Sequence, residues 1–151
     1  MLSSEQHSTI YLKIPALLFI EKIQNDRSIK RPITISYRNA KHGAEWICNT
    51  EDDFINLTRY FRRARGSVAF GDLSSNIFVY KVGYFHGEFH VDIADYARLI
   101  SPKANFPEFH DDSLSVDSSN ISLVWEDLKL INFDRLQLRG AIIRRRNGEE
   151  K

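Results

Sequence analysis

Two stretches rich in β-branched and aromatic residues, separated by a histidine–glycine pair, place the strongest constraint on how this chain folds. Residues 77–85 and 88–96 have the composition of strands, because such side chains pack well on a pleated surface. Between them, His86-Gly87 suits a tight turn, since glycine tolerates the positive φ that hairpin turns need. The stretch therefore predicts a β-hairpin.

The hairpin has one register that places apolar residues together on one face. From the turn outward, the predicted pairs are Phe85 with Glu88, Tyr84 with Phe89, Val82 with Val91, Lys81 with Asp92, and Tyr80 with Ile93. One face is then apolar, and the other face has opposite charges directly across from each other. A slip by one residue would move one strand's apolar set to the wrong face, so we expect this register to be well defined.

Every second residue from the turn onward is polar, which raises the alternative of a metal or catalytic site. The four residues are His86, Glu88, His90 and Asp92. Neighbours of this set on one strand lie about 6–7 Å apart, whereas a metal ion needs ligands that converge at about 2.0–2.2 Å, usually from several elements. We expect a solvated hairpin face, no catalytic residue and no metal or other cofactor.

Length and composition predict one globular domain over residues 1–151, with short flexible ends at about residues 1–8 and 147–151. Hydrophobic residues make up 42% of the chain, charged residues 27%, and the net charge is +1. With Cys48 as the one cysteine, no internal disulfide can form, and a small buried hydrophobe is the expected role. No apolar run is long enough for a membrane span, and the N-terminus lacks the basic start and apolar stretch of a signal peptide. These features predict a cytoplasmic protein without membrane contact.

Two helices are predicted. The first follows Pro15, with apolar residues at helical spacing: Ala16, Phe19, Ile20 and Ile23. The second runs from Thr50, a candidate N-cap with Asp53 three residues on, to Gly66. Acids in its first turn and arginines in its last turn match the helix dipole.

The remaining segments predict a mostly antiparallel sheet. Strands are expected at residues 9–14, 33–37, 45–48, 67–70, 121–126 and 140–146, a long loop at 101–120, and either helix or strand at 127–138. The fold class is therefore α+β, a twisted sheet packed against about two helices.

Two further patterns suggest chemistry. Asp127 and Lys129 follow an expected strand, as in the core of metal-dependent nucleases, but such a site needs another acid from a neighbouring strand. Arginine clusters at residues 59–65 and 139–146, the first beside Tyr60 and Phe61, suggest single-stranded nucleic-acid binding. The helix dipole and a solvated tail explain the same arginines, so we expect neither an enzyme nor a nucleic-acid partner.

An acidic interval is more informative about a partner. No Lys or Arg occurs between Lys103 and Lys129. The interval contains the residues that we expect to bind a basic protein partner: Phe106, Glu108, Phe109, Asp111, Asp112, Asp117, Glu126 and Asp127. Complementary charge speeds encounter, and buried aromatic side chains slow dissociation. The alternative is a solvated loop.

The order of these segments resembles small bacterial immunity proteins of contact-dependent growth inhibition systems. The resemblance covers roughly residues 33–130: "SYRNAKHGAEW", an amphipathic helix, "GSVAF", the hairpin "NIFVYKVGYFHGEFHVDI", an acidic loop and "LVWEDL". It implies a twisted antiparallel sheet with helices, similar to the Whirly single-stranded-DNA-binding domain. It also implies a non-enzymatic function: binding a cognate toxin, often a nuclease, and covering its active site or a neighbouring surface. The family has no catalytic residues to carry over.

Overall fold

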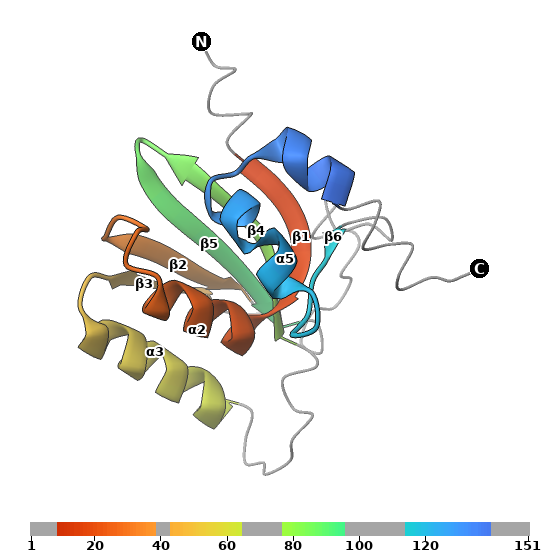
Figure 1. Cartoon of the computed structure of the whole chain (residues 1–151). Coiled ribbons are helices and arrows are strands. Elements are labelled where there is room, and N and C mark those ends of the chain that lie inside the picture. The colour runs from red at the N-terminus through yellow and green to blue at the C-terminus, as the bar shows by residue number, and fades with distance from the viewer. Residues whose placement is uncertain (1–8, 39–42, 65–76, 96–113, 140–151) are drawn as a thin grey trace.

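The computed structural model describes residues 9–38, 43–64, 77–95 and 114–139 (Figure 1). The strands are β1 (Thr9–Pro15), β2 (Ile33–Arg38), β3 (Gly43–Cys48), β4 (Ile77–Phe85), β5 (Glu88–Asp95) and β6 (Leu114–Ser115). The helices are α2 (Ala16–Asn25), α3 (Glu51–Ala64) and α5 (Ile121–Lys129), and residues 133–139 are also helical. The expected strands at 67–70 and 140–146 and the expected flexible ends lie outside the described residues.

The strands form one mixed sheet in the order β3-β2-β5-β4-β1-β6 (Figure 1). Neighbours β3–β2, β5–β4 and β4–β1 are antiparallel, whereas β2–β5 and the short β1–β6 pair are parallel. The expected α+β fold with a mostly antiparallel sheet is confirmed. The parallel β2–β5 pair was not expected, and the chain crosses between its two strands through β3, α3 and β4.

The β4–β5 hairpin has the predicted register from the turn to Lys81–Asp92. His86 and Gly87 have φ values of 54° and 82°, as a type I′ turn requires. The predicted pair of Tyr80 with Ile93 is wrong. Val79 faces Ile93 instead, and Tyr80 is the extra residue of a β-bulge.

The helices cover one face of the sheet (Figure 1). An apolar row crosses that face through five strands: Ile10, Val82, Val91, Ile35 and Trp46. Helix α2 buries the four residues predicted from its spacing, Ala16, Phe19, Ile20 and Ile23, and α3 buries Phe54, Leu57 and Phe61. Since each large apolar side chain stabilises the fold by about 1.5–3 kcal/mol when fully buried, this layer is the core.

The next row along the strands points to the other face of the sheet, called here the open face. It consists of Tyr11, Lys81, Asp92, Ser36 and Glu45, from β1 across to β3. Lys81 Nζ lies 4.0 Å from Asp92 Oδ2, and both side chains are about a quarter exposed. The hairpin therefore has the two-sided character that its sequence predicts.

Helix α3 begins with the predicted capping box. The Asp53 carboxylate accepts hydrogen bonds from the backbone N–H groups of Asn49 and Thr50, both at 2.8 Å. In return, the Asp53 N–H donates to Thr50 Oγ1 at 3.3 Å. These bonds hold the pKa of Asp53 below its ordinary value and satisfy donors that the first helical turn leaves unpaired.

The prediction of a strand at residues 121–126 is wrong, because these residues open helix α5. Four buried apolar residues recur at helical spacing, namely Ile121, Val124, Trp125 and Leu128. Trp125 packs edge-on against Phe19, with ring centroids 5.4 Å apart. Residues 127–138, which could have been helix or strand, continue α5 to Lys129 and are helical again from 133.

Helix α5 ends in a Schellman motif with an unusual residue. Ile131 has φ 52°, a left-handed conformation that normally favours glycine. The N–H of Asn132 donates to the Asp127 carbonyl at 2.8 Å, and that of Ile131 to the Leu128 carbonyl at 3.1 Å. Burial of the Ile131 side chain opposes this backbone strain.

We expect Thr50→Ala to lower the free energy of unfolding by about 1 kcal/mol, because it removes the N-cap acceptor of α3. Thr50→Ser keeps the hydroxyl and serves as the matched control. Urea unfolding followed by circular dichroism measures the difference. Equal stability of the two variants would show that the cap does not stabilise α3.

Candidate functional site

The alternating polar residues of the hairpin do not converge on one point. His86 lies in the turn, and Glu88, His90 and Asp92 follow one another along β5. Asp92 faces Lys81, and the ring of His90 packs edge-on against Phe85, with centroids 5.1 Å apart. Within the described residues, no three His, Cys, Asp or Glu side chains are grouped so that they could hold a metal ion.

Asp127 and Lys129 do not form a shared site, because they lie on a helix rather than at a strand end. Residues two apart on a helix point roughly 200° away from each other. Lys129 Nζ pairs with Asp26 at 2.8 Å, whereas Asp127 Oδ2 lies 2.7 Å from Arg139 Nε. The helix therefore removes the geometric basis of the nuclease interpretation.

Asp26, just after α2, is the centre of a network that sequence reasoning missed. Its Oδ2 accepts hydrogen bonds from Trp125 Nε1 at 2.7 Å and Lys129 Nζ at 2.8 Å. Its Oδ1 accepts from the N–H and hydroxyl of Ser28. Lys129 also donates to Ser28 Oγ at 2.7 Å, and its carbonyl accepts the Tyr84 hydroxyl at 2.9 Å. The network joins α2, α5 and β4.

The Asp26 network contains a stable ion pair. Burial alone would raise the pKa of Asp26, but hydrogen bonds from Lys129, Ser28 and Trp125 outweigh burial and hold that pKa well below its ordinary value of 3.8. The hydrogen bond to Asp26 likewise raises the pKa of Lys129. The side chains of Asp26 and Lys129 are only 18% and 11% exposed. Lys129 is thus a structural cation in this fold.

Arg31 binds the backbone at the same end of α2. Its guanidinium donates to four backbone carbonyls, those of Ile23, Gln24, Asp26 and Ile29, at 2.8–3.3 Å. It also lies over the Phe54 ring of α3, 5.0 Å from the centroid. Since the last carbonyls of a helix have no partner within it, Arg31 completes the end of α2 while contacting α3.

The structure describes three of the eight residues expected to bind a partner. Phe106, Glu108, Phe109, Asp111 and Asp112 lie outside the described residues. Asp117 is exposed, and its carboxylate accepts hydrogen bonds from Ser119, which hold its pKa below the ordinary value. Glu126 is also exposed, with 76% of its side chain accessible. Asp127 is buried in its ion pair with Arg139, which leaves little of it for a partner to contact.

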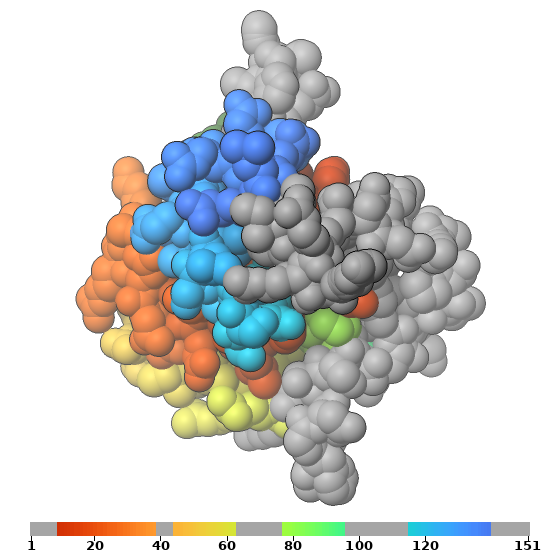
Figure 2. Space-filling view, turned by 45° about the vertical axis from the view of Figure 1, so that its right-hand side comes forward, coloured from red at the N-terminus to blue at the C-terminus, as the bar shows by residue number. Residues whose placement is uncertain are grey.

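Helix α5 and the segment after it expose three large apolar side chains. Leu123, Leu130 and Phe133 are 45%, 63% and 48% exposed. Leu123, Glu126 and Leu130 share one side of the helix, because they are three and seven residues apart. The two helical segments, 121–129 and 133–139, lie side by side on one face of the molecule (Figure 2). We call Leu123, Glu126, Leu130 and Phe133 the α5 surface.

Glu126 is among the residues expected to bind a partner, but the three apolar residues of the α5 surface are not, because the sequence predicts a strand at residues 121–126. In a strand, Leu123 would lie on the face opposite Val124 and Glu126 would share the face of Val124. The helical spacing of Ile121, Val124 and Leu128 was the signal that could have revealed it.

Helix α3 exposes an aromatic side chain among arginines. Tyr60 is 40% exposed, and its neighbours Arg59 and Arg62 are exposed as well. The Tyr60 ring packs on Trp46 of β3, with centroids 4.9 Å apart. A basic surface with a stacking platform is the arrangement that single-stranded nucleic acids favour.

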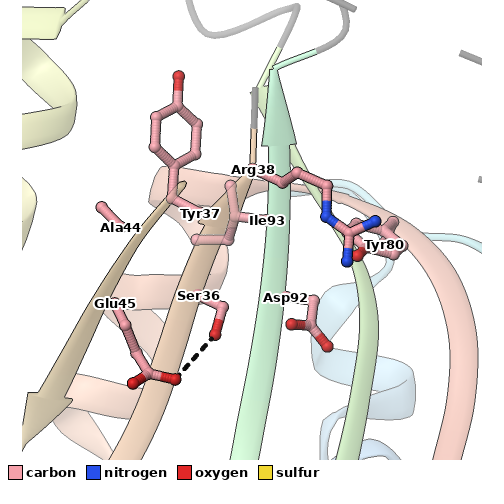
Figure 3. Close-up of a pocket in the computed structure, with 8 residues that line it drawn as sticks. All are labelled: Ser36, Tyr37, Arg38, Ala44, Glu45, Tyr80, Asp92 and Ile93. Carbon is pink, nitrogen blue, oxygen red and sulfur yellow. Dashed lines mark hydrogen bonds between the residues drawn. The ribbon is translucent and has the colours of Figure 1, made fainter. Parts of the chain in front are cut away.

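A shallow pocket of about 370 Å³ lies on the open face between β2, β3 and β5 (Figure 3). Ser36 donates a long hydrogen bond of 3.5 Å to Glu45. The Arg38 guanidinium lies 5.9 Å from the centroid of the Tyr80 ring, which the bulge brings to this side, and Asp92 points to the same side of the sheet. Both signs of charge line the pocket, so it has no single preference for anions or cations.

Cys48 is fully buried, and burial raises the pKa of its thiol to about 11. Because the thiolate is the nucleophilic form, the structure supports the expected role of a small hydrophobe.

Comparison with protein families, with curated proteins and with solved structures finds no match to this chain. Among the described residues, no helix has the length and apolar character needed to cross a membrane.

We expect Asp26→Asn to lower the free energy of unfolding at pH 7 by about 2–3 kcal/mol, because Lys129 would lose its buried counter-ion. Glu126→Gln removes the exposed carboxylate 3.2 Å from Lys129. This variant should lower the free energy of unfolding by less than about 1 kcal/mol. Urea unfolding of both variants beside the wild type measures the contrast.

The effect of Asp26→Asn should also depend on pH in a defined direction. The pKa of Asp26 is lower in the folded than in the unfolded chain. The Asp26 carboxylate therefore contributes fully to the free energy of unfolding when the pH is above its ordinary pKa of 3.8. This contribution is lost as the pH falls towards the pKa of the folded chain. The difference between wild type and variant should therefore shrink from pH 7 to pH 3. A constant difference would mean that the carboxylate charge contributes nothing.

Proposed function

We propose that this chain is an immunity protein, a non-enzymatic cytoplasmic protein that neutralises a cognate bacterial toxin by covering its active site or a neighbouring surface. Two observations support the proposal. The order of segments resembles immunity proteins of contact-dependent growth inhibition systems, and the α5 surface has the composition of a protein-binding site. The α5 surface is the observation that carries the argument.

The exposed apolar residues of the α5 surface, together with Glu126, suit a protein partner. Large apolar side chains grouped at a surface, within a polar rim, mark interaction sites in soluble proteins. Leu130 and Phe133 are about half exposed or more, so a partner would remove substantial apolar area from water there. Glu126 lies one helical turn from Leu130 and adds a negative charge.

The charges favour a basic partner. Asp117 precedes α5 and Glu126 lies on it, and both are exposed. A toxin that cleaves nucleic acid needs a basic site for the phosphates of its substrate. Carboxylates placed against such a site would attract the toxin and compete with the substrate. A nuclease toxin is therefore the kind of partner that we propose.

Single-stranded nucleic-acid binding is the second candidate, and the arrangement of Tyr60 with Arg59 and Arg62 on α3 favours it. The two functions use different surfaces, because α3 and α5 cover different parts of the sheet (Figure 1). Replacement of Arg59 and Arg62 by Gln should abolish binding to a labelled single-stranded oligonucleotide if this candidate is right, and should leave toxin binding unchanged if it is wrong.

The proposal predicts that a toxin domain is encoded beside the gene for this chain, and the decisive experiment uses that domain. Cells that produce the toxin domain alone should stop growing, and co-production of this chain should restore growth. The purified proteins should form a complex of defined stoichiometry by isothermal titration calorimetry. Failure of both rescue and binding would refute the proposal.

We expect two variants of the α5 surface to weaken the complex in different ways. Leu130→Ala should speed dissociation and raise Kd about 30-fold, which corresponds to a hot-spot contribution of about 2 kcal/mol. Glu126→Gln should mainly slow association and flatten its salt dependence.

The matched controls are Ile55→Ala and Glu51→Gln on α3, because both positions are exposed and lie off the α5 surface. Surface plasmon resonance at two salt concentrations separates the rates. Similar losses in the control variants would place the interface elsewhere.

A further inference from the structure

The sheet ends at β3, and no described strand lies on its outer side. All six residues of β3 pair with β2 without a bulge. In an antiparallel pair, alternate residues direct their N–H and C=O groups away from the neighbouring strand. As far as the described residues go, the outer edge of β3 is therefore a straight row of backbone donors and acceptors that another strand can pair with.

Edge strands in natural proteins usually contain features that prevent such pairing, including prolines, lysines and bulges. The sequence of β3, "GAEWIC", has no proline and no basic residue, and its one charged residue is Glu45. Ile47 is 62% exposed on the open face. Trp46 and the half-exposed Tyr60 add aromatic area on the helix-covered side of the same edge. This edge has the features of a docking strand.

We propose that β3 pairs antiparallel with β3 of a second copy of this chain, around a two-fold axis at Ile47, to form one continuous sheet. The net charge of +1 opposes association of two copies only weakly. Closed two-fold dimers are also the commonest homo-oligomers.

The side chains select the position of the axis. In the continuous sheet, the open faces of both copies lie on the same side. Because directly opposed residues share a face, each residue must oppose either its own counterpart or a residue an even number of positions away in sequence. The two-fold axis, perpendicular to the sheet, therefore passes through a residue position. An axis at Glu45 would oppose two carboxylates directly, which is destabilising. An axis at Trp46 would place each Glu45 against Ile47 of the other copy. An axis at Ile47 pairs Ile47 with itself and Glu45 with Asn49, whose amide can donate to the carboxylate.

This dimer goes beyond the proposed function and is compatible with it. Helix α5 lies over the β4 side of the sheet, where Lys129 contacts Tyr84, whereas β3 is the far edge (Figure 1). Self-association would leave both α5 surfaces open, so one dimer could bind two toxin molecules.

The first test is the mass in solution. The wild-type chain, 17.6 kDa, should approach twice that mass in sedimentation equilibrium as its concentration rises between about 1 µM and 1 mM. Ile47→Lys should remain monomeric, because it would place two ammonium groups across the two-fold axis. Ile55→Lys on α3, at another exposed isoleucine, is the control and should dimerise as the wild type does.

The second test fixes the register. Directly opposed residues have Cα atoms about 4.5–5.5 Å apart, within the range that a disulfide allows, about 4.4–6.8 Å. Under mild oxidation by oxidised glutathione, Ile47→Cys should form a covalent dimer, whereas Glu45→Cys, which would face Asn49, should not. The native Cys48 does not compete, because its thiol is fully buried.

A wild-type chain that stays monomeric up to 1 mM would overturn the proposal, and so would equal cross-linking of the two cysteine variants. If the chain is monomeric and Ile47→Lys weakens binding of the toxin domain, the edge instead accepts an extended segment of the toxin, and self-pairing is wrong. None of these outcomes depends on whether the α5 surface binds the toxin.

Discussion

The register of the β4–β5 hairpin sets the alignment of the whole sheet, because the hairpin occupies its centre. β1 pairs with the outer side of β4 and β2 with the outer side of β5, and β3 follows β2. The pairing of Val82 with Val91 therefore determines which residues of the neighbouring strands lie on the buried face of the sheet. The bulge at Tyr80 changes this alternation at one place and turns a large aromatic side chain towards the open face. One extra residue therefore gives the pocket on that face an aromatic wall beside Arg38.

Polar contacts between distant parts of the chain hold the helical layer together. Asp26 and Lys129 are 103 residues apart in sequence, yet their hydrogen bond fixes the end of α2 against the end of α5. Arg31 then completes the carbonyl end of α2 and lies on Phe54 of α3. Apolar burial supplies most of the stability, but it is not directional. The hydrogen bonds of Asp26 and Arg31 give this packing a defined geometry.

The parts of the fold that sequence predicted are those set by neighbouring residues. The correctly predicted hairpin pairs and the capping box of Thr50 and Asp53 join residues at most eleven positions apart, so patterning revealed them. Residues 121–126 were misassigned because β-branched and aromatic composition was given more weight than the spacing of Val124, Trp125 and Leu128. That error also hid the exposed leucines of the α5 surface. The Asp26–Lys129 pair and the parallel β2–β5 alignment depend on the tertiary fold, and no local pattern predicts them.

The parallel alignment of β2 with β5 has a consequence for the order of folding. Pairs such as Ile35 with Val91 close a loop of more than fifty residues, and that closure is entropically costly. The β2–β3 and β4–β5 hairpins need only short loops and can form early. During synthesis on the ribosome, the first half of the chain is complete before its central strands exist. The inner edge of β2 is then exposed, and the nascent chain is open to mispairing until the second hairpin emerges. We expect the docking of these two hairpins to be the slow step of folding, because it requires that long loop to close.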